Sequence, residues 1–361
     1  MNQRENALTT LSIIQQLATS SSRTDKEQII FRAVMAGETE FFLGLRLALD
    51  PLVTFDLTKV AEIIEDDGEP GDFSFADFLT LAHDLWRRKM TEAEARAAIN
   101  NAAERCHTAT WNLFYRRILL KQLNIGLQPK TINKVLNKLV TAYPQAHDYL
   151  VPIIGCQLPH DGSAPLHQRR LKGRKRIDTK LDGIRAITIL DTEAQSVNLF
   201  TETGKKLTAP GLQDALSGLL GQLPGSVALD GMLVSPQGAV PNLHRKESHL
   251  DNDTIKYALF DILPLADFRV GFCPMPQQQR HAMLATIQEC GLWRTTNGRV
   301  YVVPQIEVDL DTQSGRATLA EFSHQAVALG YKAIMIKDPD APYNMKRSTA
   351  WLQVPTGLQP W

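Results

Sequence analysis

The six residues KLDGIR, Lys180 to Arg185, bring a lysine, a carboxylate, a glycine and an arginine together in one short stretch. A lysine that loses its proton beside a bound triphosphate can attack phosphorus as a nucleophile. Arg185 could bind a phosphate or ribose oxygen through paired hydrogen bonds, and Gly183 allows a tight turn. Taken alone, the hexapeptide is as compatible with an ordinary surface hairpin as with nucleotidyl chemistry at Lys180.

The composition excludes few functions. The chain has 361 residues, of which 43% are hydrophobic and 22% are charged, with 39 basic and 39 acidic side chains. This length favours two domains, and the balanced charge leaves any electrostatic function to local clusters. The four cysteines are far apart and predict reduced thiols of a cytoplasmic protein. The first residues lack the pattern of a signal peptide, and no apolar run is long enough to span a membrane.

The first part of the chain has the 3.6-residue hydrophobic rhythm of helices. Leu8, Leu11, Ile14 and Leu17 would share one helical face, and Thr91 with Glu94 forms a capping-box pattern. These patterns predict an all-helical domain over residues 1–159.

The later part alternates short β-rich runs with turns, and two helical stretches interrupt it. This pattern predicts an α+β domain with mainly antiparallel sheets over residues 177–361. Between the two parts, the sequence HDGSAPLHQRRLKGRKR is turn-rich and then strongly basic, so a basic linker is expected over residues 160–176.

Five segments in a fixed order identify a family. KLDGIR is followed by LDGMLV (229–234), YALFDILPL (257–265), YKAIMIKDPDAPY (331–343) and RSTAWLQVP (347–355). In this order the segments resemble the motifs of ATP-dependent DNA ligases and RNA-capping nucleotidyltransferases. The helical stretch 115–139 is similar to the DNA-binding domain of bacteriophage-type ligases. The resemblance implies a helical DNA-binding domain followed by a nucleotidyltransferase (ATP-grasp-like adenylation) domain. Family ligases continue into an OB-fold, which we do not expect here because the sequence stops at Trp361.

The resemblance assigns roles to several residues. Lys180 matches the adenylylated lysine, with Asp182, Gly183 and Arg185 completing its motif. Phe260 matches the aromatic residue that stacks on adenine, and Lys337 matches the lysine that reaches the α-phosphate.

Other family positions are changed. Met232 and Lys332 stand where the family has carboxylates, so no metal site is predicted. Glu202 replaces an arginine, and Gln353 and Pro355 replace a lysine pair. Adenylyl transfer needs cations and a metal ion to offset charge on phosphate, and a thioether cannot replace an oxygen ligand of a hard metal ion. These changes predict loss of ligation, with Lys180 as a remnant.

Basic residues offer DNA contacts of the sequence-independent kind. The expected set in the helical domain is Arg116, Arg117, Lys121, Lys130, Thr131, Asn133, Lys134 and Lys138, with Thr131 and Asn133 placing backbone N–H groups at a phosphate. The expected set in the linker is Arg169, Arg170, Lys172, Arg174, Lys175 and Arg176.

The sequence therefore predicts a ligase-like protein that binds duplex DNA, nicked or ended, as a scaffold, protector or competitor. No cofactor is required, and ATP or AMP with Mg²⁺ enters only if nucleotide binding survives. Two alternatives stay open. One is an active ATP-dependent ligase that forms a Lys180–AMP intermediate. The other is a protein-interaction subunit that binds or inhibits a nuclease or defence complex. No membrane partner is expected.

Overall fold

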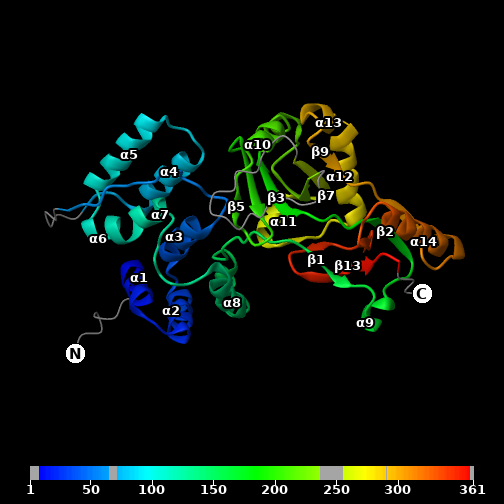
Figure 1. Ribbon diagram of the computed structural model, residues 1–361. Helices are drawn as coiled ribbons and strands as arrows, with labels where there is room; N and C mark the ends of the chain where they lie inside the picture. The colour runs from blue at the N-terminus through cyan, green and yellow to red at the C-terminus, as the bar shows by residue number, and fades with distance from the viewer. Residues whose placement is uncertain (1–7, 65–70, 236–254, 290, 358–361) are drawn as a thin grey trace. The chain divides into compact units, whose positions relative to one another are not determined.

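The computed structural model describes residues 8–64, 71–235, 255–289 and 291–357 (Figure 1). The chain divides into two compact units, Met1–Ile153 and Ile154–Trp361. None of the helices in these described ranges is long and apolar enough to cross a membrane.

The described part of the first unit is built from helices. They are α1 (Thr10–Thr19), α2 (Arg23–Ala36), α3 (Thr39–Leu49), α4 (Phe75–Trp86), α5 (Glu92–Glu104), α6 (Thr108–Thr110), a π-helical turn (Trp111–Tyr115), α7 (Arg116–Leu119), α8 (Pro129–Leu139) and a 3₁₀ turn (Pro144–His147). Their apolar faces meet in one core, in which the rings of Phe78 and Tyr115 stack with centroids 4.3 Å apart. The predicted capping box at Thr91 and Glu94 is present at the start of α5.

The second unit combines three sheets with helices. Its strands are β1 (Leu158–Asp161), β2 (Arg174–Thr179), β3 (Ile184–Asp191), β4 (Ser196–Thr201), β5 (Lys206–Leu207), β6 (Val227–Val234), β7 (Lys256–Pro264), β8 (Phe272–Cys273), β9 (Val300–Val302), β10 (Ile306–Asp309), β11 (Ala333–Lys337), β12 (Tyr343–Asn344) and β13 (Arg347–Pro355). Its helices are α9 (Pro165–Gln168), α10 (Pro210–Ser217), a 3₁₀ turn (Leu220–Gln222), α11 (Leu265–Val270), α12 (Gln277–Glu289), α13 (Leu292–Thr295) and α14 (Gln313–Ala328).

The strands are mainly antiparallel, as predicted. A six-stranded sheet has the order β5-β4-β3-β6-β7-β9, a five-stranded sheet has the order β1-β13-β11-β2-β10, and β8 pairs with β12. Two pairs are parallel, β1 with β13 and β7 with β9, so the sheets are mixed.

The five-stranded sheet separates two different environments. Side chains of a strand point alternately to its two faces. Ile177, Ile334 and Ile336 lie on the face that packs into a buried core with Leu319 of α14. Their neighbours in sequence, Asp178 and Lys337 among them, lie on the other face and reach the pocket described below.

The basic segment 160–176 differs from the expected linker. It contains α9 and parts of β1 and β2, and it belongs to the second unit. Leu171 packs against the core beneath α14, and the carbonyl of Gly173 accepts a hydrogen bond from the Leu310 N–H. Burial of one apolar side chain and pairing of the backbone therefore hold a segment whose charge suggests a free tether.

A buried ion pair ties α12 to the six-stranded sheet. Arg280 Nε and Nη2 donate to the two carboxylate oxygens of Asp261 at 2.7 and 3.0 Å, and both side chains are fully buried. A third nitrogen, Nη1, donates to the Ala341 carbonyl at 3.3 Å. The arginine thus joins α12, β7 and the loop before β12.

Asp261→Ala should leave the Arg280 charge buried without its partner. We expect the free energy of unfolding of the second unit to fall by about 3–5 kcal/mol, and the pair Asp261→Leu with Arg280→Met to recover most of it. Hydrogen–deuterium exchange of the β7 amides measures this local stability. Glu92→Ala, which removes an exposed ion pair with Arg96 in α5, is the control and should leave β7 exchange unchanged. Equal exchange of the β7 amides in Asp261→Ala and wild type would show that the Asp261–Arg280 pair does not stabilise this sheet.

Candidate functional site

Lys180 directly follows β2, and its backbone is held by the neighbouring strand. Its N–H donates to the Ala333 carbonyl at 3.0 Å, which extends the β2–β11 pairing by one residue. Gly183 allows the close approach that follows, because a Cβ there would lie 2.2 Å from the Leu233 carbonyl oxygen of β6. A glycine at residue 183 is therefore required by the close approach of this turn to β6.

Asp182 stands between two lysines. Its Oδ1 is 3.4 Å from Lys180 Nζ, and its Oδ2 is 3.5 Å from Lys332 Nζ. The Lys180 side chain is 35% exposed and that of Lys332 is 86% exposed. One carboxylate thus faces two ammonium groups at the rim of the site.

Arg185 forms a two-point ion pair across the six-stranded sheet. Its Nε and Nη2 donate to Asp230 on β6 at 2.9 and 2.6 Å, and both side chains are almost fully buried. The Tyr343 hydroxyl donates to the same carboxylate at 2.5 Å. Burial raises the pKa of Tyr343, and the charge of Asp230 raises it further, so the phenol stays protonated as a donor.

Lys337 is buried and held in place on β11. Its ammonium lies 2.7 Å from Asp178 Oδ2 on β2, and Gln305 donates to the same oxygen at 2.7 Å. The ammonium also lies 5.1 Å from the ring centroid of Phe260 and 4.8 Å from that of Trp351. A carboxylate and two aromatic rings therefore satisfy this buried charge.

These side chains line one pocket, which we call the Lys180 pocket, with a volume of about 100 Å³. Of the residues predicted from the sequence, Lys180, Arg185, Phe260 and Lys337 line it, and so does Met232. Asp182 and Gly183 do not line the pocket, although Asp182 contacts Lys180 at its rim.

Sequence reasoning missed polar and aromatic residues at the pocket. Asp178 and Trp351 line it, and Gln305 orients Asp178. Asp178 could have been found, since it lies two residues before Lys180 on the strand face that leads to it. Trp351 lies in the segment 347–355, in which the resemblance assigns roles only to positions 353 and 355. Gln305 lies outside all five segments that carry the resemblance.

A divalent cation does not fit the donors around this pocket. Three nearby carboxylates of the described chain are already neutralised: Asp178 by Lys337, Asp182 by two lysines and Asp230 by Arg185. Met232 supplies only a thioether, which a hard metal ion does not prefer. Within the described ranges no three His, Cys, Asp or Glu side chains are grouped as metal ligands would be.

In the helical unit, several predicted DNA-contacting residues have internal partners. Arg116 Nε donates to the Val60 carbonyl at 2.8 Å, and Lys121 Nζ donates to the carbonyls of Leu47 and Asp50, both at 2.7 Å. Asn133 exchanges two hydrogen bonds with the Val151 backbone. The Thr131 N–H, expected at a phosphate, donates to the Gln128 carbonyl within its own turn. These groups hold loops of this unit together.

The remaining residues of that set differ in their surroundings. Arg117 donates a long, 3.5 Å hydrogen bond to the Leu123 carbonyl. Lys130, Lys134 and Lys138 are exposed on α8. Burial lowers the pKa of Lys121 to about 8.

The basic residues 169–176 do not form one continuous surface. Arg174 and Arg176 pair with Glu307 on β10, and Lys175 points to the other face of β2, where it lies 3.4 Å from Asp338. Arg169, Arg170 and Lys172 are exposed ahead of the strand.

Comparison with known proteins places this geometry in a family. Residues 163–354 match the family model described as ATP dependent DNA ligase domain. The chain belongs to the ATP-dependent DNA ligase family. The solved structure "Pmar-Lig_PreS3" is 35% identical, with 96% of this chain and 78% of that chain covered and a TM-score of 0.55. The structure "Pmar-Lig_Pre." gives the same identity and TM-score, with 77% of its chain covered. The ATP-dependent DNA ligase from bacteriophage T7 in complex with ATP is 17% identical over 55% of this chain and 68% of its own, with a TM-score of 0.43. No curated protein sequence matches.

The ligase domain of this chain therefore spans β2 to β13, the strands that carry Lys180, Arg185, Lys337 and Trp351. Membership in the ligase family agrees with the order of the five motifs. The residues to which the sequence resemblance assigns the family's lysine, arginine and aromatic roles, Lys180, Lys337, Arg185 and Phe260, all line this one pocket.

His281 next to this ligase pocket predicts a pH dependence of stability. Burial lowers the pKa of His281 to about 4, and the nearby charges of Arg176 and Lys337 act in the same direction. The neutral ring accepts a hydrogen bond from Arg176 at 2.9 Å. The unfolded chain binds this proton near pH 6.5, and the folded chain binds it only near pH 4. The free energy of unfolding should therefore decrease as the pH is lowered from 6.5 to 4, by at most about 3 kcal/mol.

His281→Gln should flatten that decline, measured as the denaturation midpoint at a series of pH values. The exposed His324 provides the control, since His324→Gln should keep the decline of the wild type. An identical pH profile in His281→Gln and wild type would show that the ring is not held neutral.

Proposed function

We propose that this ligase-family protein binds duplex DNA, nicked or ended, without joining it, as a scaffold, protector or competitor. The observation that carries the proposal is the charge balance at the Lys180 pocket. Among the described residues, Asp178, Asp182 and Asp230 are each paired there with a lysine or arginine. The sequence resemblance adds that Met232 and Lys332 match positions where the family has carboxylates.

The paired carboxylates bear directly on adenylyl transfer. The reaction builds negative charge on the α-phosphate and on the leaving pyrophosphate, which preorganised cations must offset. Lys337 is a candidate for this role, but its ammonium is already committed to Asp178 at 2.7 Å, with both side chains almost fully buried. Moving it to a phosphate would leave Asp178 buried without its counter-charge, which is costly. Lys180 and Lys332 remain at the rim, where they can attract a phosphate without metal-assisted chemistry.

Incubation with α-labelled ATP and Mg²⁺ or Mn²⁺ tests the lost activity. We expect no covalent label on the wild type, because each missing electrostatic group costs on the order of 10²–10³ in rate. Met232→Glu combined with Lys332→Glu restores both carboxylates and should be the first variant to gain label. Lys180→Ala in either background is the control. Label on the wild type that disappears in Lys180→Ala would instead make this chain an active adenylyltransferase.

The α8 helix carries the strongest feature for DNA contact in the described part of the first unit. Lys130, Lys134 and Lys138 recur every fourth residue and are exposed, which places them along one side of the helix. Ile132, Val135, Leu136 and Leu139 on the other side are buried in the core. A row of like charges destabilises a helix slightly, and a phosphate backbone would relieve the repulsion.

Replacing Lys130, Lys134 and Lys138 with Gln should weaken binding to a nicked duplex and lower the salt slope of log K by about 2–3. Gel shifts at a series of salt concentrations measure both quantities. The matched control replaces Arg23, Lys59 and Arg96, three exposed cations of the same unit, with Gln. Equal losses in the two triple variants would remove α8 as the contact surface. No binding by the wild type at low salt would leave the protein-interaction alternative.

A further inference from the structure

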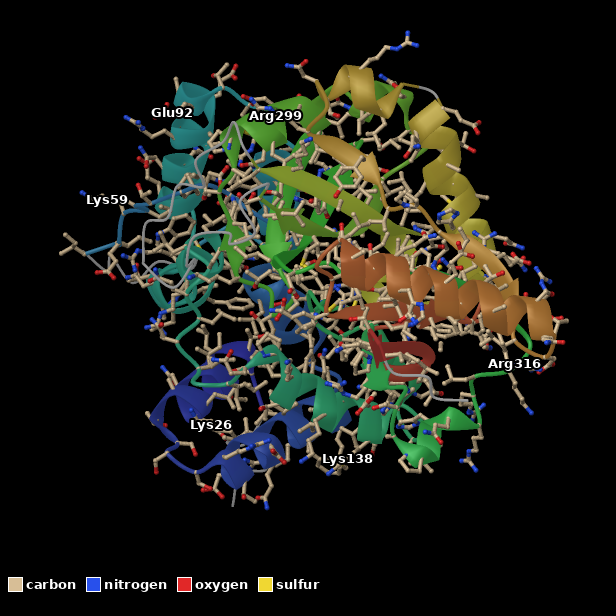
Figure 2. All side chains as sticks on the ribbon, turned by 45° about the vertical axis from the view of Figure 1, so that its right-hand side comes forward. Lys26, Lys59, Glu92, Lys138, Arg299 and Arg316 are labelled. Atoms are coloured by element: carbon tan, nitrogen blue, oxygen red, sulfur yellow. The ribbon has the colours of Figure 1, made fainter. Side chains whose placement is uncertain are left out.

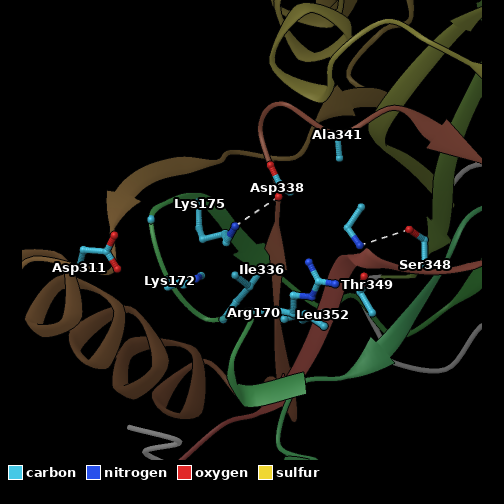
Figure 3. A pocket seen from close by; sticks show the side chains of 12 residues that line it. Arg170, Lys172, Lys175, Asp311, Ile336, Asp338, Ala341, Ser348, Thr349 and Leu352 are labelled. Carbon is cyan, nitrogen blue, oxygen red and sulfur yellow. Dashed lines mark hydrogen bonds and ion pairs between the residues drawn. The ribbon is translucent and has the colours of Figure 1, made fainter. Parts of the chain in front are cut away.

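A second pocket lies on the opposite face of the five-stranded sheet from Lys180. We call it the Arg170 pocket, and its volume is about 480 Å³ (Figure 3). Ile336 of β11 and Leu352 of β13 line it, while their neighbours in sequence, Lys337 and Trp351, line the Lys180 pocket. Because side chains alternate along a strand, the two pockets share a sheet but not a face.

Three basic side chains surround the Arg170 pocket. Figure 3 shows Arg170, Lys172 and Lys175 gathered around it, from the segment that leads into β2 and from β2 itself. Arg170 and Lys172 are exposed, and their side chains have no hydrogen-bond or ion-pair partner among the described residues. Lys175 is only 12% exposed and lies 3.4 Å from Asp338 at the edge of the pocket.

The backbone holds two of these cations in position. Leu171, between Arg170 and Lys172, packs into the core beneath α14. Gly173 has φ +66°, a conformation that favours glycine, and its carbonyl accepts from the Leu310 N–H at 3.0 Å. The chain therefore presents both side chains from a fixed turn, which lowers the entropy cost of binding a ligand between them.

We propose that the Arg170 pocket binds a phosphate group. An arginine donates two parallel hydrogen bonds to phosphate oxygens, and two lysines add charge from other sides. Thr349 supplies a hydroxyl at the same pocket. Asp311 and Asp338 also line it and oppose an anion, but the described cations outnumber them by one. The pocket is separate from the Lys180 pocket, so its ligand is a different phosphate from any that Lys180 meets.

The phosphate comes either from the backbone of bound DNA or from a free phosphate compound. Both present the same oxygens to Arg170 and Lys172. The duplex measurement rests on the proposed function, whereas the pyrophosphate measurement does not and separates a failure of this pocket from a failure of DNA binding.

Residue-specific lysine acetylation of the full chain tests the proposal. At low salt, the acetylation rate of Lys172 is measured by mass spectrometry with and without pyrophosphate, and separately with a short duplex. The exposed Lys205 and Lys206 of the second unit serve as internal references. We expect protection of Lys172 and not of the references.

Arg170→Ala should raise the ligand concentration needed for protection about tenfold, the effect of losing a charge-assisted hydrogen bond. Arg169→Ala removes a neighbouring exposed charge that does not line the pocket and should keep the protection. Circular dichroism confirms that both variants fold.

The two ligands separate the two sources. If the duplex protects Lys172 and pyrophosphate does not, the pocket binds the DNA backbone. If pyrophosphate protects Lys172, the pocket binds free phosphate groups, whether or not the duplex also protects it. Unchanged Lys172 acetylation with both ligands, or an equal loss of protection in Arg169→Ala, would overturn the proposal.

Discussion

A charged side chain that leaves water must find an opposite charge, and this requirement organises the second unit. Lys337 with Asp178, Arg185 with Asp230 and Arg280 with Asp261 are buried pairs that join strands and helices distant in sequence. The first two lie at the Lys180 pocket, so the pocket's shape and charge are set together. Figure 2 draws the described side chains on the ribbon. Any ligand that draws one partner away must replace its charge.

The five-stranded sheet adds a geometric constraint. Lys175, Arg176 and Lys180 belong to one short run of chain, yet strand alternation sends Lys175 to the Arg170 pocket and Arg176 to Glu307 on the other face. A shift of β2 by one residue would exchange the two faces, and Ile177 or Thr179 would then take the place of Asp178 beside Lys337. The same backbone register therefore maintains two chemically different pockets.

Much of this arrangement could be predicted from the sequence, because ordered motifs fix which strands meet. Lys180, Arg185, Phe260 and Lys337 were expected together and line one pocket. Charge patterns were less informative, since a lysine in a basic run can turn toward solvent or toward a backbone carbonyl. Lys121 binds the carbonyls of Leu47 and Asp50, more than seventy residues away, and no local pattern reveals such a partner. The expected linker over residues 160–176 is instead part of the second unit, again because of a partner distant in sequence. Its Leu171 packs against a core to which α14 contributes.

The changes at family positions are coupled in space. By the sequence resemblance Lys332 matches a position where the family has a carboxylate, and its ammonium shares Asp182 with Lys180. A carboxylate at residue 332 would face Asp182 instead, and a cation between them would be needed to offset the repulsion. A lysine at this position supplies a positive charge without a metal ion, and Met232 on β6 adds only an uncharged thioether to the lining of the Lys180 pocket. Lys180 and Lys332 give the rim two positive charges against the one negative charge of Asp182, and this excess attracts phosphate. The carboxylates of Asp178 and Asp230, which could otherwise bind a metal ion, are paired with Lys337 and Arg185. A lysine at residue 332 thus favours phosphate attraction over metal binding at this rim, which is the balance that the proposed function requires.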